Sequence, residues 1–205
     1  MPPPTANTGI VLIDPYNDFL HPEGKMYFAT KEDLGRKNTI AHLKELVAFA
    51  RSRKIPIYYG LHQQYKPGFF DGWKHMAHIH ENIKKTATFA EGSFGAEIYQ
   101  GLEPSLENGD VVVSKHWNSS SFQNTDLDFQ LRQRDITHLV LAGMTANTCL
   151  ESTARYAYEL GYHVTLLTDA TAGFDPKATD AATEIIWPIF ASEVTTVRGF
   201  IDKST

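Results

Sequence analysis

The sequence predicts one α/β domain, a three-layer α-β-α sandwich with a mostly parallel, doubly wound sheet of six strands. Short apolar, β-branched runs alternate with longer segments of helical period along nearly the whole chain. The apolar runs are continuous, which is typical of parallel strands that helices cover on both faces. Right-handed crossovers between such strands place helices on both sides of the sheet.

The six strands are expected where turn-forming residues bound an apolar run. The first is residues 9–13 (GIVLI), which Asp14 and Pro15 bring to an end. The other five runs are residues 55–61, 111–114, 139–142, 163–167 and 193–197.

Helices are expected between these strands. Residues 30–33 (TKED) resemble a capping pattern, in which a Thr precedes a carboxylate by three positions. Apolar residues then recur at helical spacing from Leu34 to Ala50, so one helix is expected there. Shorter helices are expected at residues 126–134, about 146–160, and 177–189.

Two segments fall outside this alternation. Residues 62–108 are irregular and rich in Gly, aromatic residues and His, and we expect short helices that form a lid or a subunit contact. Residues 1–8 are Pro-rich and polar, and flexibility is expected there. No composition break suggests a linker, so residues 1–205 are interpreted as a single domain.

The composition of the 205-residue chain excludes several classes of protein. With 42% hydrophobic and 21% charged residues it is typical of a globular protein, and its net charge of −5 argues against nucleic-acid or anionic-membrane partners. No long apolar window predicts a membrane span. One cysteine cannot form an intrachain disulfide, and the N-terminus lacks the features of a signal peptide. A reducing, cytoplasmic location is therefore expected.

Three reactive side chains fall where strands end. Asp14 ends the first strand, Lys115 ends the third, and Cys149 lies just beyond the fourth. In open parallel sheets the ligand site lies beyond the carboxyl ends of the strands, so these residues are expected to converge on one edge. Each also has an ordinary structural explanation: Asp before Pro forms turns, Lys is usually solvated, and a lone Cys is usually a small buried hydrophobe.

Cys149 is expected in the first turn of a helix. Unpaired N–H groups and the positive end of the helix dipole favour an anion there. A helix N-terminus or a nearby Lys lowers a thiol pKa from about 8.5 toward neutrality, which favours the nucleophilic thiolate. The same N–H groups can hold a tetrahedral oxyanion.

At these residues the chain resembles the isochorismatase-like cysteine hydrolase superfamily, which includes nicotinamidases, N-carbamoylsarcosine amidases, ureidoacrylate amidohydrolases and isochorismatases. Residues 13–19 (IDPYNDF) are similar to the family's Asp-x-Gln-Asn-Asp-Phe, and residues 113–115 (VSK) to its lysine signature. Residues 143–150 (GMTANTCL) are similar to the turn that carries the nucleophile. The resemblance runs from about Gly9 to Val197.

The resemblance implies a role for each of these residues. Asp14 would be the general base, Lys115 would orient and charge-stabilise the pair, and Cys149 would attack a carbonyl carbon. A cis peptide between Met144 and Thr145 would aim the N–H groups of Thr145 and Cys149 at the oxyanion. The implied reaction is hydrolysis of a C–N bond in a small amide, ureido or carbamoyl substrate through a thioester. Family members commonly form homo-oligomers, so a dimer or tetramer is expected.

The chain departs from the metal-dependent members of this family. They carry an Asp-x-His pair after the second strand, whereas residues 60–62 here are GLH. His62, His75, His78 and His80 remain nearby, but they are interpreted as surface or pocket histidines rather than metal ligands. No required metal or cofactor is expected, and loss of activity on chelation would contradict this.

Aromatic residues near the predicted edge are expected to wall a small substrate pocket. They are Tyr16, Phe19, His62, Trp117 and Phe122. His116 is given no role, because adjacent residues of a strand face opposite ways and Lys115 is expected to face the site.

Three other functions are weighed against amide hydrolysis. An isochorismatase would cleave a vinyl ether without a cysteine nucleophile, and pyruvate release against ammonia release would separate the two. A non-catalytic effector could retain the fold, but this chain retains all three reactive residues. A nucleotide- or flavin-binding protein is disfavoured because residues 143–148 are not a G-x-G-x-x-G motif.

Overall fold

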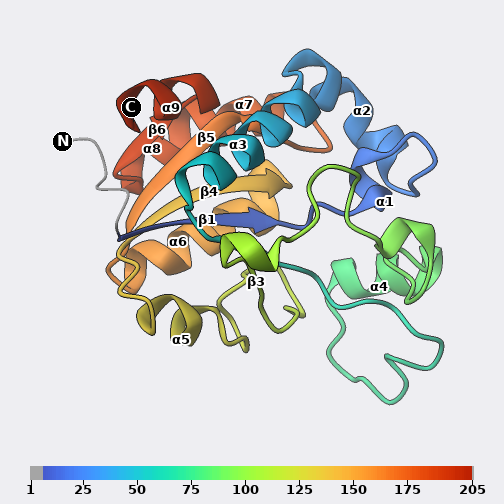
Figure 1. The fold of residues 1–205 in the computed structure, drawn as a ribbon. Coiled ribbons are helices and arrows are strands. Elements are labelled where there is room, and N and C mark those ends of the chain that lie inside the picture. The colour runs from blue at the N-terminus through green and yellow to red at the C-terminus, as the bar shows by residue number, and fades with distance from the viewer. Residues whose placement is uncertain (1–6, 205) are drawn as a thin grey trace.

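A computed structural model describes residues 7–204 and shows six parallel strands in the order β3-β2-β1-β4-β5-β6 (Figure 1). The predicted fold class is confirmed. All five pairings between neighbouring strands are parallel. The strands are β1 (Thr8–Ile13), β2 (Ile57–Gly60), β3 (Val111–Val112), β4 (His138–Met144), β5 (His163–Ala172) and β6 (Glu193–Thr195).

Each face of the sheet has its own core, because side chains alternate along a strand. In β1, Ile10 and Leu12 join the cluster that Leu46 and Phe200 help to form, on the side of α3 and α9. Val11 and Ile13 join the opposite cluster, which contains side chains of α5, α6 and α8. Since both faces of β1 are buried, the strand reads as a continuous apolar run.

Helices connect the strands and cover the sheet (Figure 1). They are α1 (Asn17–Leu20), α2 (Tyr27–Arg36), α3 (Thr39–Arg53), α4 (His78–Thr86), α5 (Leu127–Arg132), α6 (Glu151–Glu159), α7 (Pro176–Asp180), α8 (Trp187–Phe190) and α9 (Val197–Ser204). Short helical turns add η2 (Phe94–Ala96), η3 (Leu106–Asn108), η4 (Ala146–Leu150) and η5 (Ala181–Ile186). Within the described residues no helix combines the length and apolar character that a membrane crossing needs.

The helix predicted over residues 34–50 is two helices, so that prediction is wrong. Asn38, with a φ of 51°, separates α2 from α3, and Asn tolerates this left-handed conformation better than most residues. Thr30 does not cap a helix either. It lies inside α2, where its hydroxyl donates to the Phe19 carbonyl at 2.7 Å and anchors α2 to α1.

The predicted flexible segment, residues 1–8, falls largely on residues 1–6, which lie outside the described residues. Thr8 contradicts the prediction, because it is the first residue of β1 and is buried. Residues 62–108 contain α4, η2 and η3, as the expected short helices.

The strand order reverses between β1 and β4, which pair along their length in the middle of the sheet. In open α/β sheets this point leaves a crevice at the carboxyl ends of the strands, where ligands bind. Asp14 follows β1, and Cys149 follows β4 by five residues. The fold therefore brings these two residues to the same crevice.

Candidate active site

Asp14 lies at the bottom of the crevice and is only 1% exposed. The turn after β1 holds it at a φ of 47°, and its N–H donates to the Gly60 carbonyl at 2.9 Å. Oδ1 accepts the His62 N–H at 2.7 Å and lies 3.2 Å from His116 Nε2. Oδ2 is buried, and none of the described residues donates a hydrogen bond to it. One oxygen of this carboxylate is therefore held in place, and the other is available to a reacting group.

Lys115 and His116 face opposite ways, as expected of neighbours, but in the reverse of the predicted sense. Lys115 Nζ donates to Gln64 Oε1 at 2.9 Å, and no carboxylate of the described residues lies within ion-pair distance of it. His116 is fully buried and faces Asp14. The reason is the register of the chain after β3 ends: a single parallel bridge pairs His116 with His62 and so decides which residue faces Asp14. A change of phase by one residue exchanges the two faces of a strand.

Two buried histidines surround Asp14. Burial, followed by the charge of neighbouring His116, lowers the pKa of His62 to about 4. For His116, burial by itself would lower the pKa, but the charge of Asp14 and hydrogen bonds to Asp14 and Asn118 raise it overall. The positive charge of this pair is therefore favoured on His116, and His62 is neutral at physiological pH.

Cys149 lies in η4, a π-helical turn that leads directly into α6. Its side chain is 5% exposed, and burial, followed by the charge of Asp14 and a hydrogen-bond interaction with it, raises the thiol pKa well above its usual value. Hydrogen bonds from Thr148 and from the Thr145 backbone act in the other direction without reversing the shift. The predicted lowering of the thiol pKa is wrong, because burial beside a carboxylate outweighs the helix terminus.

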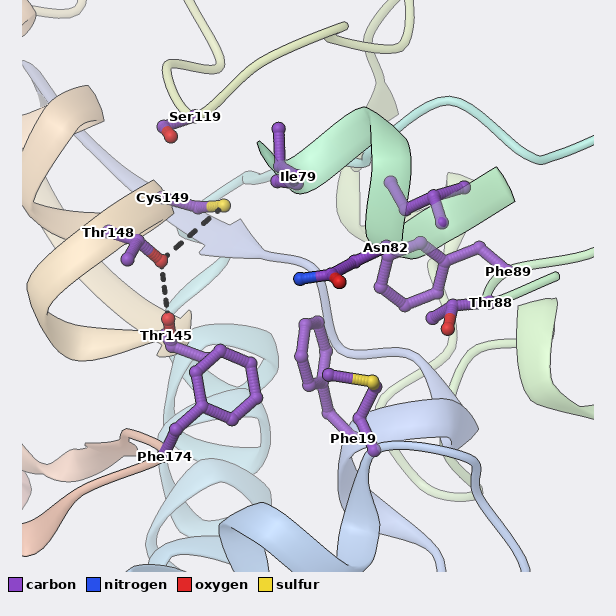
Figure 2. Close-up of a pocket in the computed structure, with 12 residues that line it drawn as sticks. Phe19, Ile79, Asn82, Thr88, Phe89, Ser119, Thr145, Thr148, Cys149 and Phe174 are labelled. Carbon is purple, nitrogen blue, oxygen red and sulfur yellow. Dashed lines mark hydrogen bonds between the residues drawn. The ribbon is translucent and has the colours of Figure 1, made fainter. Parts of the chain in front are cut away.

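The turn before Cys149 depends on close packing against β1. The peptide bond between Met144 and Thr145 is cis, and Gly143 has a φ of 111°. A Cβ at Gly143 would lie 2.0 Å from the Ile13 carbonyl oxygen, so only glycine fits there. The Thr171 hydroxyl of β5 donates to the Gly143 carbonyl at 2.6 Å. Figure 2 shows the Thr148 hydroxyl between Thr145 and Cys149, where it donates to the sulfur at 3.9 Å.

A cavity of about 270 Å³ lies in front of Cys149 (Figure 2). It is mostly apolar and is bounded by segments that follow β1, β4 and β5 and by α4. The lining residues are Phe19, Met26, Ile79, Asn82, Ile83, Thr88, Phe89, Ser119, Thr145, Thr148, Cys149 and Phe174. None of these side chains is charged.

Of the five predicted wall residues, Phe19 lines this cavity. Tyr16 is fully buried behind it, with its hydroxyl on the His62 carbonyl at 2.8 Å, and His62 packs beside Phe89. Trp117 stacks on Phe69 at a ring distance of 4.9 Å. Phe122 belongs to the core on the other face of the sheet. None of these four residues lines the cavity.

Sequence reasoning missed the walls that α4 and the segment after β5 supply. Phe174 lies two residues after the end of β5, so the rule that sites lie at the carboxyl ends of strands could have found it. Ile79, Asn82 and Ile83 share one side of α4, but nothing in the sequence indicates where that helix packs.

The histidines after β2 do not gather around a common point. His80 Nδ1 accepts the Ala77 N–H at 3.1 Å and Nε2 lies 3.1 Å from the Trp117 carbonyl, so this residue caps α4. His78 is exposed beside Glu81. The described residues contain no group of three or more His, Cys, Asp or Glu side chains arranged to hold a metal ion.

Known proteins share both the sequence pattern and the fold. The family model of the isochorismatase domain matches residues 8–198. Ureidoacrylate amidohydrolase RutB of Agrobacterium fabrum is 30% identical over 206 residues, covering 95% of this chain and 89% of that protein. A cysteine hydrolase structure from Pseudomonas syringae pv. phaseolicola has a TM-score of 0.76 at 25% identity and covers 100% of this chain and 95% of that one. The structure of N-carbamoylsarcosine amidase from Thermoplasma acidophilum has a TM-score of 0.65 at 25% identity and covers 93% of this chain and 95% of that one. The chain belongs to the isochorismatase family, within the isochorismatase-like cysteine hydrolase superfamily.

Proposed function

We propose that this protein is an amidohydrolase that cleaves a C–N bond through a thioester on Cys149. The observation that carries the proposal is the buried Cys149 thiol beside the Asp14 carboxylate, at the wall of a mostly apolar cavity. Similar proteins named as ureidoacrylate amidohydrolase and N-carbamoylsarcosine amidase support the same reaction class.

The first half of the reaction forms the thioester. The raised pKa of Cys149 keeps the resting thiol protonated, so its proton passes to Asp14 as the sulfur attacks the carbonyl carbon. The C–S bond forms and the carbonyl electrons move to oxygen. Backbone N–H groups of Thr145 and Cys149 are the proposed donors to that oxyanion. Collapse breaks the C–N bond, and Asp14 returns the proton to the departing nitrogen as ammonia or an amine.

The second half releases the acid. Asp14, again a carboxylate, takes a proton from water while the water oxygen attacks the thioester carbonyl. Collapse breaks the C–S bond, and the thiolate recovers the proton from Asp14. Protons and electrons balance over the two steps, with one water consumed and no oxidant or metal in the scheme.

The cavity indicates the class of substrate. Its lining is apolar apart from hydroxyl groups and the Asn82 amide, which Figure 2 shows directed into the cavity. A buried carboxylate without a cationic partner would be costly, so the proposed substrate is an uncharged amide, urea or carbamate with an apolar group. This differs from ureidoacrylate, whose carboxylate needs a cationic partner that this lining lacks.

Turnover of an amide panel by wild type and Cys149→Ala tests the proposal. Matched pairs of substrates, each with an uncharged and a carboxylate form, test the substrate class. Wild type is expected to prefer the uncharged member, and Cys149→Ala to lose turnover while keeping the wild-type thermal midpoint. Mass spectrometry should find the acyl adduct on Cys149, the only cysteine of the chain.

Three outcomes would contradict the proposal. They are unchanged turnover in Cys149→Ala, an adduct on another residue, and pyruvate release from isochorismate with no amide hydrolysis. The homo-oligomer predicted from the sequence stays a prediction, which sedimentation of the purified protein tests.

A further inference from the structure

His116 and Lys115 are adjacent cationic residues with different surroundings. His116 is fully buried, and its backbone is fixed to the end of β2 on both sides: its N–H donates to the Leu61 carbonyl, and its carbonyl accepts the Gln63 N–H, both at 2.9 Å. Its ring is therefore aimed at Asp14 by main-chain bonds. Main-chain anchoring gives a ring orientation that the side chain alone would not hold.

The tautomer of His116 follows from its other hydrogen bond. Nδ1 lies 2.6 Å from the Asn118 carbonyl oxygen, which only accepts, so Nδ1 carries a proton. Nε2 then faces Asp14 Oδ1 at 3.2 Å either as the second N–H of an imidazolium or as a lone pair. A lone pair opposite a carboxylate oxygen would be repulsive. A proton on Nε2 removes this repulsion and makes the two side chains a charged pair at ion-pair distance.

Lys115 is engaged in a different task. Its Nζ donates to Gln64 Oε1 at 2.9 Å, and Gln64 Nε2 donates to the Ala96 carbonyl at 3.0 Å. Gln63 Nε2 donates to the Lys115 carbonyl at 3.0 Å. These bonds join the ends of β2 and β3 to η2, so Lys115 ties the loops together at the side of the crevice.

We propose that His116, and not Lys115, is the cationic positioning residue of Asp14, an assignment that rests on the proposed function of Asp14 and Cys149. The imidazolium lies 3.2 Å from Oδ1, the oxygen that also accepts the His62 N–H, which leaves Oδ2 to take the proton of Cys149. It also offsets the negative charge that would otherwise oppose a thiolate beside a carboxylate. His116 acts through Asp14 and is not itself in contact with the substrate cavity.

The groups that face this pair come from three elements. Asp14 follows β1, His62 follows β2 with its ring 5.2 Å from that of His116, and Cys149 lies in η4. Lys115 is the neighbour along the chain. Because His62 is neutral at physiological pH and the pKa of His116 is raised by the charge of Asp14, His116 is the histidine of this pair on which a positive charge is favoured.

Alkylation of Cys149 by iodoacetamide tests this without a known substrate, because the chain has no other cysteine. The rate is measured across pH for wild type, His116→Gln, His116→Lys and Lys115→Met, with the thermal midpoint of each. In His116→Gln the apparent thiol pKa is expected to rise and alkylation at neutral pH to slow about tenfold or more, the effect of losing a nearby opposite charge. Lys115→Met is expected to stay within about threefold of wild type.

His116→Lys separates charge from structure. It restores a cation that titrates at higher pH, so the alkylation rate is expected to recover relative to His116→Gln. Hydrolysis, where it is measured, should extend to more alkaline pH in this variant than in wild type.

The assignment is overturned if Lys115→Met slows alkylation tenfold, or if a folded His116→Gln alkylates with the wild-type pH profile. If His116→Gln does not fold, the Lys115→Met result decides by itself. Failure of the proposed function is distinguishable, because amide turnover that survives Cys149→Ala would reject the thioester while leaving the alkylation results unaffected.

Discussion

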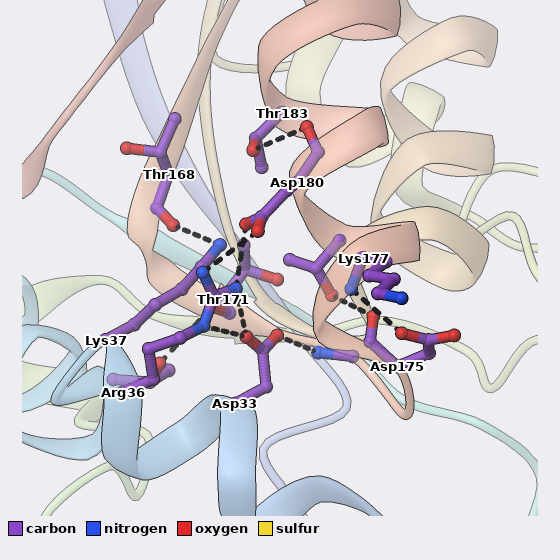
Figure 3. Close-up of polar contacts among 12 residues, drawn as sticks. Asp33, Arg36, Lys37, Thr168, Thr171, Asp175, Lys177, Asp180 and Thr183 are labelled. Atoms are coloured by element: carbon purple, nitrogen blue, oxygen red, sulfur yellow. Dashed lines mark hydrogen bonds and ion pairs between the residues drawn. The ribbon is translucent and has the colours of Figure 1, made fainter.

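Two buried carboxylates at the carboxyl edge of the sheet, Asp14 and Asp33, differ in how completely they are satisfied. Each is 1% exposed. Asp33 Oδ2 accepts the Gly173 N–H at 2.8 Å, and Oδ1 accepts two donors of the Arg36 guanidinium, at 3.1 and 2.5 Å (Figure 3). Asp14 Oδ1 accepts the His62 N–H and lies at ion-pair distance, 3.2 Å, from His116 Nε2, whereas Oδ2 has no hydrogen-bond donor among the described residues.

This difference distinguishes a structural carboxylate from a reactive one. Asp33 joins α2 to the end of β5, and Arg36 extends the network to Asp180 of α7 at 2.8 Å. Both Asp33 oxygens accept hydrogen bonds there, so the group joins elements of the fold. An incompletely satisfied carboxylate beside a thiol costs stability, and such costs occur where function requires them.

Replacement of Asp14 should give the largest effect. Asp14→Asn keeps the shape of the side chain but removes the proton acceptor, so hydrolysis of any amide that the wild type turns over is expected to fall about a thousandfold. The free energy of unfolding is expected to change less than in Asp33→Ala. Steady-state rates and urea denaturation measure the two quantities. Retention of wild-type turnover in Asp14→Asn would remove this carboxylate from the reaction.

Asp33→Ala should have the opposite profile. It leaves the buried Gly173 N–H without a partner and removes the carboxylate that holds Arg36, so a loss of about 3 kcal/mol in the free energy of unfolding is expected. Turnover per folded molecule should stay near wild type. The matched control is Asp180→Asn, which removes the charge of the 38% exposed partner of the same Arg36 and should cost less than about 1 kcal/mol. Equal losses in the two variants would contradict the distinction.

The sequence predicted the strands well, because a parallel strand that is buried on both faces gives a continuous apolar run that is easy to recognise. It also placed Asp14 and Cys149 at one edge, since both follow strands that pair along their length. The prediction that Lys115, and not His116, faces Asp14 was wrong. Strand β3 spans only Val111 and Val112, and the local sequence pattern does not determine which way the residues after it face. The cavity walls on α4 depend on the packing of a long irregular segment, which no local pattern indicates.

Acid should affect the Asp14 region through His62. Its folded pKa of about 4 lies below the ordinary value of 6.5, because burial and then His116 oppose the charged form. The unfolded chain therefore binds the extra proton first, and the stability contribution of neutral His62 is present above pH 6.5 and is lost as pH falls toward 4. His116 has the opposite sign, because its pKa is raised: its contribution is present below its unfolded pKa and is lost as pH rises through the folded one.

The His62 effect is expected to be the smallest of the three, about 2 kcal/mol in the free energy of unfolding between about pH 7 and pH 5. Urea denaturation of wild type and His62→Gln at both pH values measures it. Wild type should lose about that much more than the variant, because glutamine does not titrate and all other groups are shared. Parallel losses would mean that His62 is not held neutral beside Asp14. In that case His62 and His116 would share the positive charge beside Asp14. The surroundings of Asp14 would then resemble those of Asp33, whose two oxygens are both paired, more closely than the distances indicate.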